Sequence, residues 1–246
     1  MQAIILAAGI AKRLRPLTDD TPKCLLKLGN SNLLHKTVAN VVSNGVQDFI
    51  IVTGYRENMI KDYLKTNFPG LNFTFLTNPD YENNNNSYSL WMTKDYVKGE
   101  ILLLDSDILF DKYIIDKLLN AGHENCLAVN FTHELDEEQI KVKLNENNKI
   151  LDIGKEVPIA ESAGESIGIE LFSPYFMKGL FAILDRKILK ENNVNEFYEK
   201  SFQELIEQKN QDNRNSIFAV NVSEFECMEI DTIQDYNKAQ NFSINE

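Results

Sequence analysis

The sequence predicts an α/β protein with a Rossmann-like three-layer sandwich, in which helices cover both faces of a mostly parallel, mixed sheet. Two observations predict this class. Apolar strand patterns alternate with amphipathic helix patterns through the first half of the chain. After Phe131 the pattern changes to short alternating stretches, which predict a small antiparallel subregion. No Gly/Ser-rich or Pro-rich linker interrupts the sequence, so we expect a single domain over residues 1–246.

The first half of the chain is expected to supply the parallel strands and their crossover helices. Leu34, Val38 and Val41 share one face of the first predicted helix, and Gly45 follows it as a stop signal. The strands of this half are expected at residues 3–7, 49–54, 73–78, 100–107 and 126–131, and the helices at 33–43, 58–68, from about 87 onward, and 113–120.

The second half is expected to supply the antiparallel subregion and the closing helices. Apolar and polar residues alternate on both sides of the polar run at 146–148, which is typical of a hairpin. The elements of this half are expected as a hairpin at 139–155, strands at 165–173 and 216–222, helices at 174–185 and 194–209, and a last helix after Asp231.

The charge distribution restricts the partners of this chain of 246 residues. The formal net charge is −12, yet residues 9–27 carry five cations against two aspartates, Asp19 and Asp20. The cations are Lys12, Arg13, Arg15, Lys23 and Lys27. Duplex nucleic acid and anionic membranes require a broad basic surface, so neither is an expected partner. A small anion bound at one local basic site remains compatible with this pattern.

The cysteines and the start of the chain indicate the compartment. Cys24, Cys126 and Cys227 lie far apart without C-x-x-C spacing, so neither a disulfide framework nor a zinc site is expected. Met1 leads directly into an apolar strand, and no apolar run approaches the length of a membrane span. We therefore expect a soluble, cytoplasmic protein. Nothing in the sequence decides its oligomeric state.

The basic segment follows the first strand, where ligands of open α/β sheets bind. Small residues in the stretch LAAG, 6–9, allow backbone N–H groups to approach a phosphate, and Arg13 and Lys23 offer neutralising charge. Neither G-x-x-x-x-G-K-[ST] nor G-x-G-x-x-G occurs at this position. A P-loop kinase and a nicotinamide-dependent dehydrogenase are therefore disfavoured.

The segment LAAGIAKRLRPLTDDTPKCLLKLG resembles the signature L-A-A-G-x-x-x-R-L-x-P-L-T-x-x-x-P-K-x-L-L of nucleotidyltransferases that make NDP-sugars and CDP-alcohols. The resemblance implies that a short backbone cradle holds the nucleotide, formed by Leu6, Ala7, Ala8 and Gly9. It also implies that Arg13 binds the β- and γ-phosphates and that Lys23 reaches the phosphates at the reacting centre. Both cations are the expected catalytic residues. The resemblance divides the chain into a nucleotide-binding half, 1–130, and an acceptor-binding half, 131–246.

Two aspartates are the expected ligands of a Mg²⁺ cofactor. Reaction of two anionic substrates requires positioning and charge neutralisation, and Mg²⁺ prefers carboxylate, phosphate and water oxygens. Asp105 and Asp107 end a buried strand, and the resemblance selects Asp107. The family's second carboxylate matches Asp231 in the segment CMEIDTIQDYNKA. Helix capping is the alternative interpretation for Asp107, whereas Asp231 can combine capping with metal binding.

The stretch NPDYENNNNSYSLW, 78–91, resembles phosphocholine cytidylyltransferases of bacterial surface-decoration pathways. Amide groups offer paired donors and acceptors for the edge of a cytosine, so we expect Asn85, Asn86 and Ser89 near the nucleotide. A polar turn that caps the following helix is the alternative.

Residues that bind the acceptor substrate are predicted from the two groups that attract an ammonium ion, aromatic rings and carboxylates. A quaternary ammonium prefers aromatic faces, which Tyr88 and Tyr175 offer. Glu165 begins a stretch, GESIGIELFS, that resembles the acceptor-side strand of cytidylyltransferases, and its carboxylate is a candidate for the amine. An exposed strand-end Glu and aromatic residues of the core are the alternatives.

The sequence therefore predicts an enzyme that transfers CMP from CTP to phosphocholine or a similar small amino-alcohol phosphate or phosphonate, releasing pyrophosphate. Its partners are CTP and the acceptor. A sugar-1-phosphate nucleotidyltransferase is one alternative, which the Asn-rich segment disfavours. A non-catalytic nucleotide-binding regulator is another, disfavoured because the basic residues and both metal carboxylates are present. Turnover on a panel of nucleotides and acceptors separates these alternatives.

Overall fold

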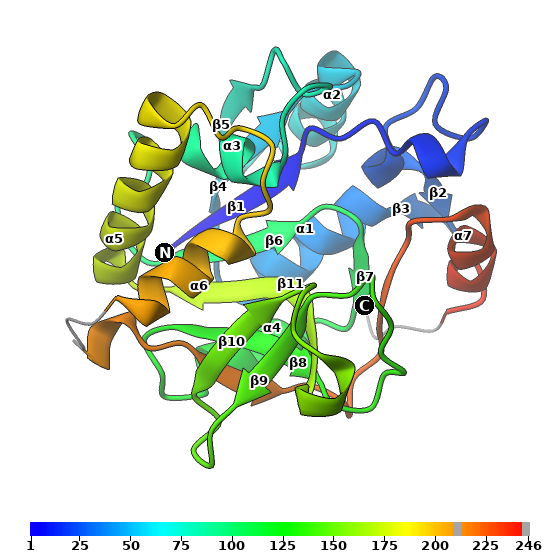
Figure 1. The fold of residues 1–246 in the computed structure, drawn as a ribbon. Helices are drawn as coiled ribbons and strands as arrows, with labels where there is room; N and C mark the ends of the chain where they lie inside the picture. Colours follow the sequence, from blue (N-terminus) through cyan, green and yellow to red (C-terminus); the bar gives the residue numbers. More distant parts are fainter. Residues whose placement is uncertain (209–212, 243–246) are drawn as a thin grey trace.

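A computed structural model describes residues 1–208 and 213–242 of the chain (Figure 1). The described residues form a nine-stranded mixed sheet with the order β10-β9-β11-β6-β1-β4-β5. Strand β8 pairs with β11, and β12 pairs with β8. One sheet thus takes strands from both halves of the sequence, which favours the single-domain prediction.

The strands of the main sheet are β1 Gln2–Ala7, β4 Asp48–Thr53, β5 Asn72–Thr77, β6 Ile101–Asp105, β8 Cys126–Asn130, β9 Lys141–Leu144, β10 Ile150–Gly154, β11 Gly164–Phe172 and β12 Phe218–Asn221. Two small ladders lie outside it, formed by β2 Lys27–Leu28 with β3 Ser31–Asn32 and by β7 Ile108–Phe110 with β13 Cys227–Glu229. The helices are α1 Leu33–Ser43, α2 Glu57–Asn67, α3 Asn86–Trp91, α4 Tyr113–Leu119, α5 Pro174–Asp185, α6 Glu199–Glu207 and α7 Ile233–Ala239.

The four strands β6, β1, β4 and β5 are parallel, so their carboxyl ends meet at one edge of the sheet. Leu6 of β1 lies opposite Asp105 of β6, and Ala7 lies opposite Thr53 of β4. In contrast, β11 runs antiparallel to β6, with Phe172 opposite Ile101. The carboxyl end of β11 therefore lies at the opposite edge of the sheet.

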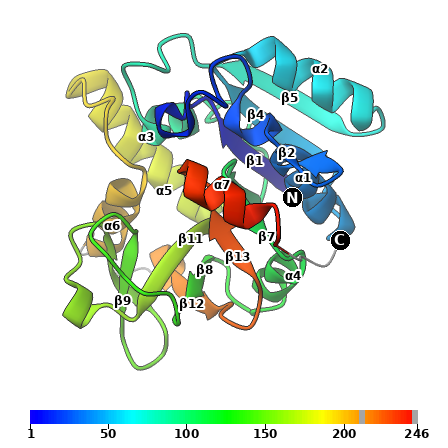
Figure 2. The same cartoon turned by 90° about the vertical axis from the view of Figure 1, so that its right-hand side faces the viewer.

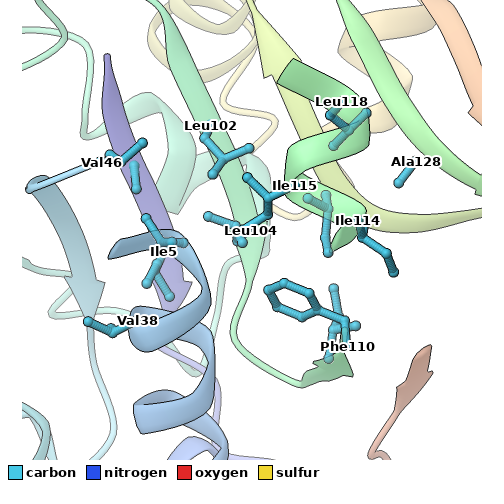
Figure 3. Close-up of a cluster of buried hydrophobic side chains, with 14 of the residues drawn as sticks. Ile5, Val38, Val46, Leu102, Leu104, Phe110, Ile114, Ile115, Leu118 and Ala128 are labelled. Carbon is cyan, nitrogen blue, oxygen red and sulfur yellow. The ribbon is translucent and has the colours of Figure 1, made fainter. Parts of the chain in front are cut away.

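Alternate residues of the central strands face two separate apolar layers. Ile5 and Leu104 face a layer covered by α1, α2 and α4, where Val38 and Ile114 are also buried (Figure 3). Ile4 faces the other layer, which α3, α5 and α6 cover. Burial on both faces explains why the parallel strands read as continuous apolar runs.

The aromatic side chains of the second layer stack between β11, α5 and α6. The ring centroid of Phe202 lies 5.0 Å from that of Phe172, 6.1 Å from that of Phe176 and 5.0 Å from that of Tyr198. All four rings are fully buried. This cluster fixes the start of α6 against the sheet.

The predicted helix at 194–209 begins later than expected, at Glu199. The preceding residues bind the Asn-rich segment instead of forming a helical turn: the carbonyl of Val194 accepts from the Asn85 amide N–H at 3.0 Å, and the Tyr198 N–H donates to Asn86 Oδ1 at 3.0 Å. The expected end at Lys209 lies outside the described residues.

The ladder of β7 with β13 was not predicted, because each strand has only three residues and they are far apart in sequence. Figure 2 shows β13 beside β7, with α7 following. The chain after Asp107 therefore enters a strand, which makes the helix-capping alternative for this residue wrong. The cap of α7 is Thr232, whose hydroxyl accepts from the Asp235 N–H, rather than Asp231.

In the part of the chain that the structure describes, no helix combines the length and the apolar character needed to cross a bilayer.

We expect the native thiols to react slowly with a disulfide reagent such as DTNB at pH 8. Cys24, Cys126 and Cys227 are free and buried, with exposed fractions of 3%, 0% and 7%. Burial raises the pKa of Cys24 and of Cys126 to about 12, so almost no thiolate forms at these two positions. Three thiols should react rapidly after unfolding in guanidinium chloride. Rapid reaction of all three in the folded protein would contradict this arrangement.

Candidate active site

A cleft of about 800 Å³ opens at the carboxyl edge of the parallel strands. Its wall begins with the last two residues of β1, Leu6 and Ala7, and with Ala8 and Gly9 of the loop after β1. Gly9 has open space around the position of a side chain, so the backbone here is accessible to a ligand. Thr18 Oγ1 donates to the Ala11 carbonyl at 2.9 Å and holds the following turn in place. All four predicted cradle residues therefore line the cleft.

Lys23 lies between two of the predicted carboxylates. Its Nζ is 2.9 Å from Asp107 Oδ2 and 2.6 Å from Asp231 Oδ1, and the side chain is only 12% exposed. Arg13 also pairs with Asp231, and its side chain remains 63% exposed. Burial alone would lower the pKa of Lys23, but the two carboxylates outweigh it and hold this pKa above its ordinary value. Lys23 is therefore a permanent cation.

The β7–β13 ladder brings three carboxylates together. Glu229 of β13 lies opposite Ile108 of β7, and the Ile230 N–H donates to the Asp107 carbonyl at 3.0 Å. As a result, carboxylate oxygens of Asp107, Glu229 and Asp231 lie within 4.8 Å of one another. Burial, and then repulsion by Asp107 and Asp231, raise the pKa of Glu229 to about 8. Three oxygen donors at this spacing fit a hard divalent cation such as Mg²⁺.

Glu229 was not predicted from the sequence. It precedes Asp231 by two residues in the segment EID, and this period-two spacing was the available signal. The strand that gives the spacing its meaning could not be identified, because β13 is short and its partner is distant in the sequence.

The Asn-rich segment caps the following helix and also lines the cleft. Asn85 Oδ1 accepts from the Asn86 N–H at 2.8 Å and caps α3, while Asn86 Oδ1 receives the Tyr198 N–H. Buried Asn78 donates to Asn84 Oδ1 at 2.7 Å and to Ser89 Oγ at 3.1 Å. These contacts stiffen the segment. Asn85, Asn86 and Ser89 also line the cleft near the loop after β1.

Glu165 lines the cleft but already has a partner. Its Oε2 lies 2.6 Å from His133 Nδ1. A hydrogen bond with Cys227, and then the bond with Glu165, raise the pKa of His133 to about 10. A protonated imidazole therefore already neutralises the carboxylate that was the candidate for the amine.

Tyr88 and Tyr175, both expected at the acceptor, do not line the cleft. Tyr88 packs against Trp91 in the apolar layer under α3, with ring centroids 5.4 Å apart. Tyr175 follows the carboxyl end of β11, at the opposite edge of the sheet, where Arg214 lies 3.9 Å from its ring centroid. The expectation failed because the sequence did not reveal the direction of β11.

A family model for nucleotidyl transferases matches residues 2–219. The chain is 31% identical over 233 residues to a CTP:phosphoglutamine cytidylyltransferase of Campylobacter jejuni, covering 85% of this chain and 90% of that protein. It is 25% identical over 247 residues to a choline-phosphate cytidylyltransferase of Streptococcus pneumoniae, covering 100% of both.

Solved structures show the same fold. A CTP:phosphocholine cytidylyltransferase from Streptococcus pneumoniae gives a TM-score of 0.81 at 24% identity, covering 98% of this chain and 97% of that chain. An inositol-1-phosphate CTP transferase from T. maritima gives 0.79 at 22% identity, covering 98% and 94%. These likenesses confirm the predicted Rossmann-like α/β class. The matching family model, over residues that include the whole loop after β1, confirms the resemblance of the first segment: the chain belongs to the nucleotidyl transferase family.

Proposed function

We propose that this nucleotidyltransferase is a Mg²⁺-dependent cytidylyltransferase that transfers CMP from CTP to phosphocholine or a similar small amino-alcohol phosphate or phosphonate. The observation that carries the proposal is the convergence of Lys23 and Arg13 with three carboxylates beside the loop after β1. The name of the relative at 31% identity gives CTP as its nucleotide and phosphoglutamine as its acceptor, which supports CTP and a small phosphorylated acceptor here. The choline-phosphate cytidylyltransferase at 25% identity supports an amino-alcohol phosphate.

The reaction forms a bond between an acceptor phosphate oxygen and the α-phosphorus of CTP. The bond from that phosphorus to the bridging oxygen of the β-phosphate breaks, and pyrophosphate leaves with the electron pair. Backbone N–H groups of residues 6–9 orient the triphosphate, and Arg13 neutralises its outer phosphates. Lys23 stabilises the charge that develops at the α-phosphate, because its ammonium lies at the reacting end of the cleft.

Asp107, Glu229 and Asp231 are the residues that would hold Mg²⁺. When bound, the ion supplies additional neutralisation of phosphate charge at this position. The amides of Asn85 and Asn86 are the proposed readers of the base, because they line the same cleft and carry both donors and acceptors.

The test is pyrophosphate release in a panel that crosses CTP, UTP, GTP and dTTP with phosphocholine, phosphoethanolamine, 2-aminoethylphosphonate and glucose-1-phosphate. We expect release with CTP and the amino-alcohol acceptors, loss of release after chelation by EDTA, and recovery when Mg²⁺ is restored. Turnover with glucose-1-phosphate and another nucleotide would show a sugar-1-phosphate enzyme. CTP binding without turnover on any acceptor would support a non-catalytic regulator.

A further inference from the structure

A buried carboxyl group without a partner lines the cleft at the start of α6. Glu199 is 6% exposed, and its Oε2 has no hydrogen-bond partner among the described residues. A buried acceptor left unpaired destabilises the protein, and more so when it is charged. Burial raises the pKa of Glu199 to about 7, so a positive ligand would stabilise the ionised form.

The surroundings of Glu199 are acidic. Asp105 lines the same part of the cleft, and Glu170 lies behind it at 1% exposure. Tyr198 Oη donates to Asp105 Oδ2 at 2.9 Å and to Glu170 Oε1 at 3.4 Å, while Glu170 Oε2 has no partner in the described chain. Burial, and then repulsion by Asp105 and Glu199, raise the pKa of Glu170 well above its ordinary range. Asp105 and Glu170 therefore share one donor hydroxyl, and Glu199 Oε2 has none.

The lysine whose charge acts on Glu199, Lys155, already has other partners. Lys155 lowers the pKa of Glu199 through its charge, but its Nζ lies 3.1 Å from Glu138 and 5.0 Å from the ring centroid of Phe197. The carboxyl groups around Glu199 are therefore not balanced by Lys155, whose ammonium already pairs with Glu138.

The residues that line the cleft distinguish two kinds of ammonium group. A trimethylammonium carries no N–H and is usually held by several aromatic faces. Among the described residues that line the cleft, the aromatic side chains are Tyr81 and Phe197. Tyr81 packs at Gly54, on the side of the loop after β1, and the ring of Phe197 faces Lys155. The described residues that line the cleft therefore form no aromatic cage around these carboxyl groups. Glu199 Oε2, in contrast, can accept a hydrogen bond from a ligand.

We propose that Glu199 binds the ammonium group of the acceptor and that this group is a primary ammonium with N–H donors. The inference rests on the proposed function and selects phosphoethanolamine-like or aminoalkylphosphonate-like acceptors within its substrate class. Tyr198, the residue before Glu199, donates to Asp105, which precedes Asp107 by two residues, and all three acidic residues line the cleft. The subsite therefore lies on the side of the proposed metal site, and a short aminoalkyl chain is the expected link between ammonium and phosphate. The primary ammonium donates a charge-assisted hydrogen bond to Glu199 Oε2 and so supplies the partner that this oxygen lacks.

The experiment compares kcat/KM with CTP for phosphoethanolamine, phosphocholine and ethyl phosphate in the wild type and in Glu199→Gln. Ethyl phosphate has the same reacting group without the ammonium. We expect the wild type to prefer phosphoethanolamine over both, and Glu199→Gln to reduce the ratio of phosphoethanolamine to ethyl phosphate by about 10- to 100-fold, which corresponds to a hydrogen bond to a charged group. The KM for CTP should not change. Glu207→Gln, an exposed change on the same helix, is the matched control.

The failures of the two proposals are distinguishable. If CMP transfer occurs but phosphocholine is preferred, or Glu199→Gln leaves the ratio unchanged, the ammonium subsite is overturned and the proposed function stands. Acceptor binding is also measured by calorimetry in the presence of a non-hydrolysable CTP analogue. Binding of phosphoethanolamine that is lost in Glu199→Gln, without turnover in the wild type, would support the subsite and overturn the proposed function. Neither binding nor turnover would overturn both.

Discussion

Lys23→Met should lower the rate of pyrophosphate release by about 10²- to 10³-fold, the usual effect of removing one group that stabilises a developing charge. The Lys23 ammonium lies between Asp107 and Asp231 at the proposed reacting centre, and the methionine chain has a similar length and packing without the charge. Steady-state kinetics at saturating CTP measure the loss. Lys27→Met, which removes an exposed cation of the same basic segment, should retain activity within a factor of about two.

The same substitution should have an opposite effect on metal binding. In the described structure the Lys23 ammonium occupies the space between carboxylates that would hold the cation, so the two compete when no nucleotide is present. Lys23→Met should therefore bind Mn²⁺ alone about tenfold more tightly, as measured by electron paramagnetic resonance of free Mn²⁺. Unchanged or weaker Mn²⁺ binding, with the variant folded, would refute this competition.

Phe202→Ala should reduce the free energy of unfolding by about 3–5 kcal/mol, the range for removing a fully buried ring. Phe202 lies against three other aromatic rings, from β11, α5 and the residue before α6, and its removal leaves all three without this packing partner. Urea denaturation followed by circular dichroism measures the change. A protein of ordinary stability, about 5–15 kcal/mol, would remain folded but close to its limit.

The control for this prediction is Leu189→Ala, because Leu189 is 64% exposed. Its effect should stay within about 0.5 kcal/mol. A loss of less than about 1 kcal/mol for Phe202→Ala would show that the aromatic cluster does not hold α6 as described.

The parts of the site that sequence reasoning located are those encoded by short, continuous stretches. Residues 6–9, Arg13 and Lys23 lie within one segment after a strongly apolar strand, and the strand-end rule places them at the ligand edge. The same rule applies to Asp105 and Asp107, and the resemblance to the nucleotidyltransferase signature selects Asp107 and Asp231. Local pattern and parallel topology thus place the segments, the resemblance selects residues within them, and the structure brings Lys23, Asp107 and Asp231 together.

The parts that sequence reasoning missed depend on long-range pairing and on strand direction. Glu229 joins the carboxylates only because β13 pairs with β7, and Tyr175 leaves the cleft only because β11 is antiparallel. Glu199 has no recognisable motif, since its significance comes from burial beside Asp105. Hydrophobic periodicity reports local secondary structure, so a contact between residues distant in sequence cannot be predicted from it.

Because of the β7–β13 ladder, the three carboxylates come together late in the synthesis of the chain. The loop after β1 leaves the ribosome early, whereas Glu229 and Asp231, two of the three carboxylates, are synthesised much later. Because chains emerge from the amino terminus and such distant pairings form late, a chain that stops before residue 229 has this loop but only Asp107 of the proposed cation site. The carboxylate cluster therefore forms only after β13 has been made and has paired with β7.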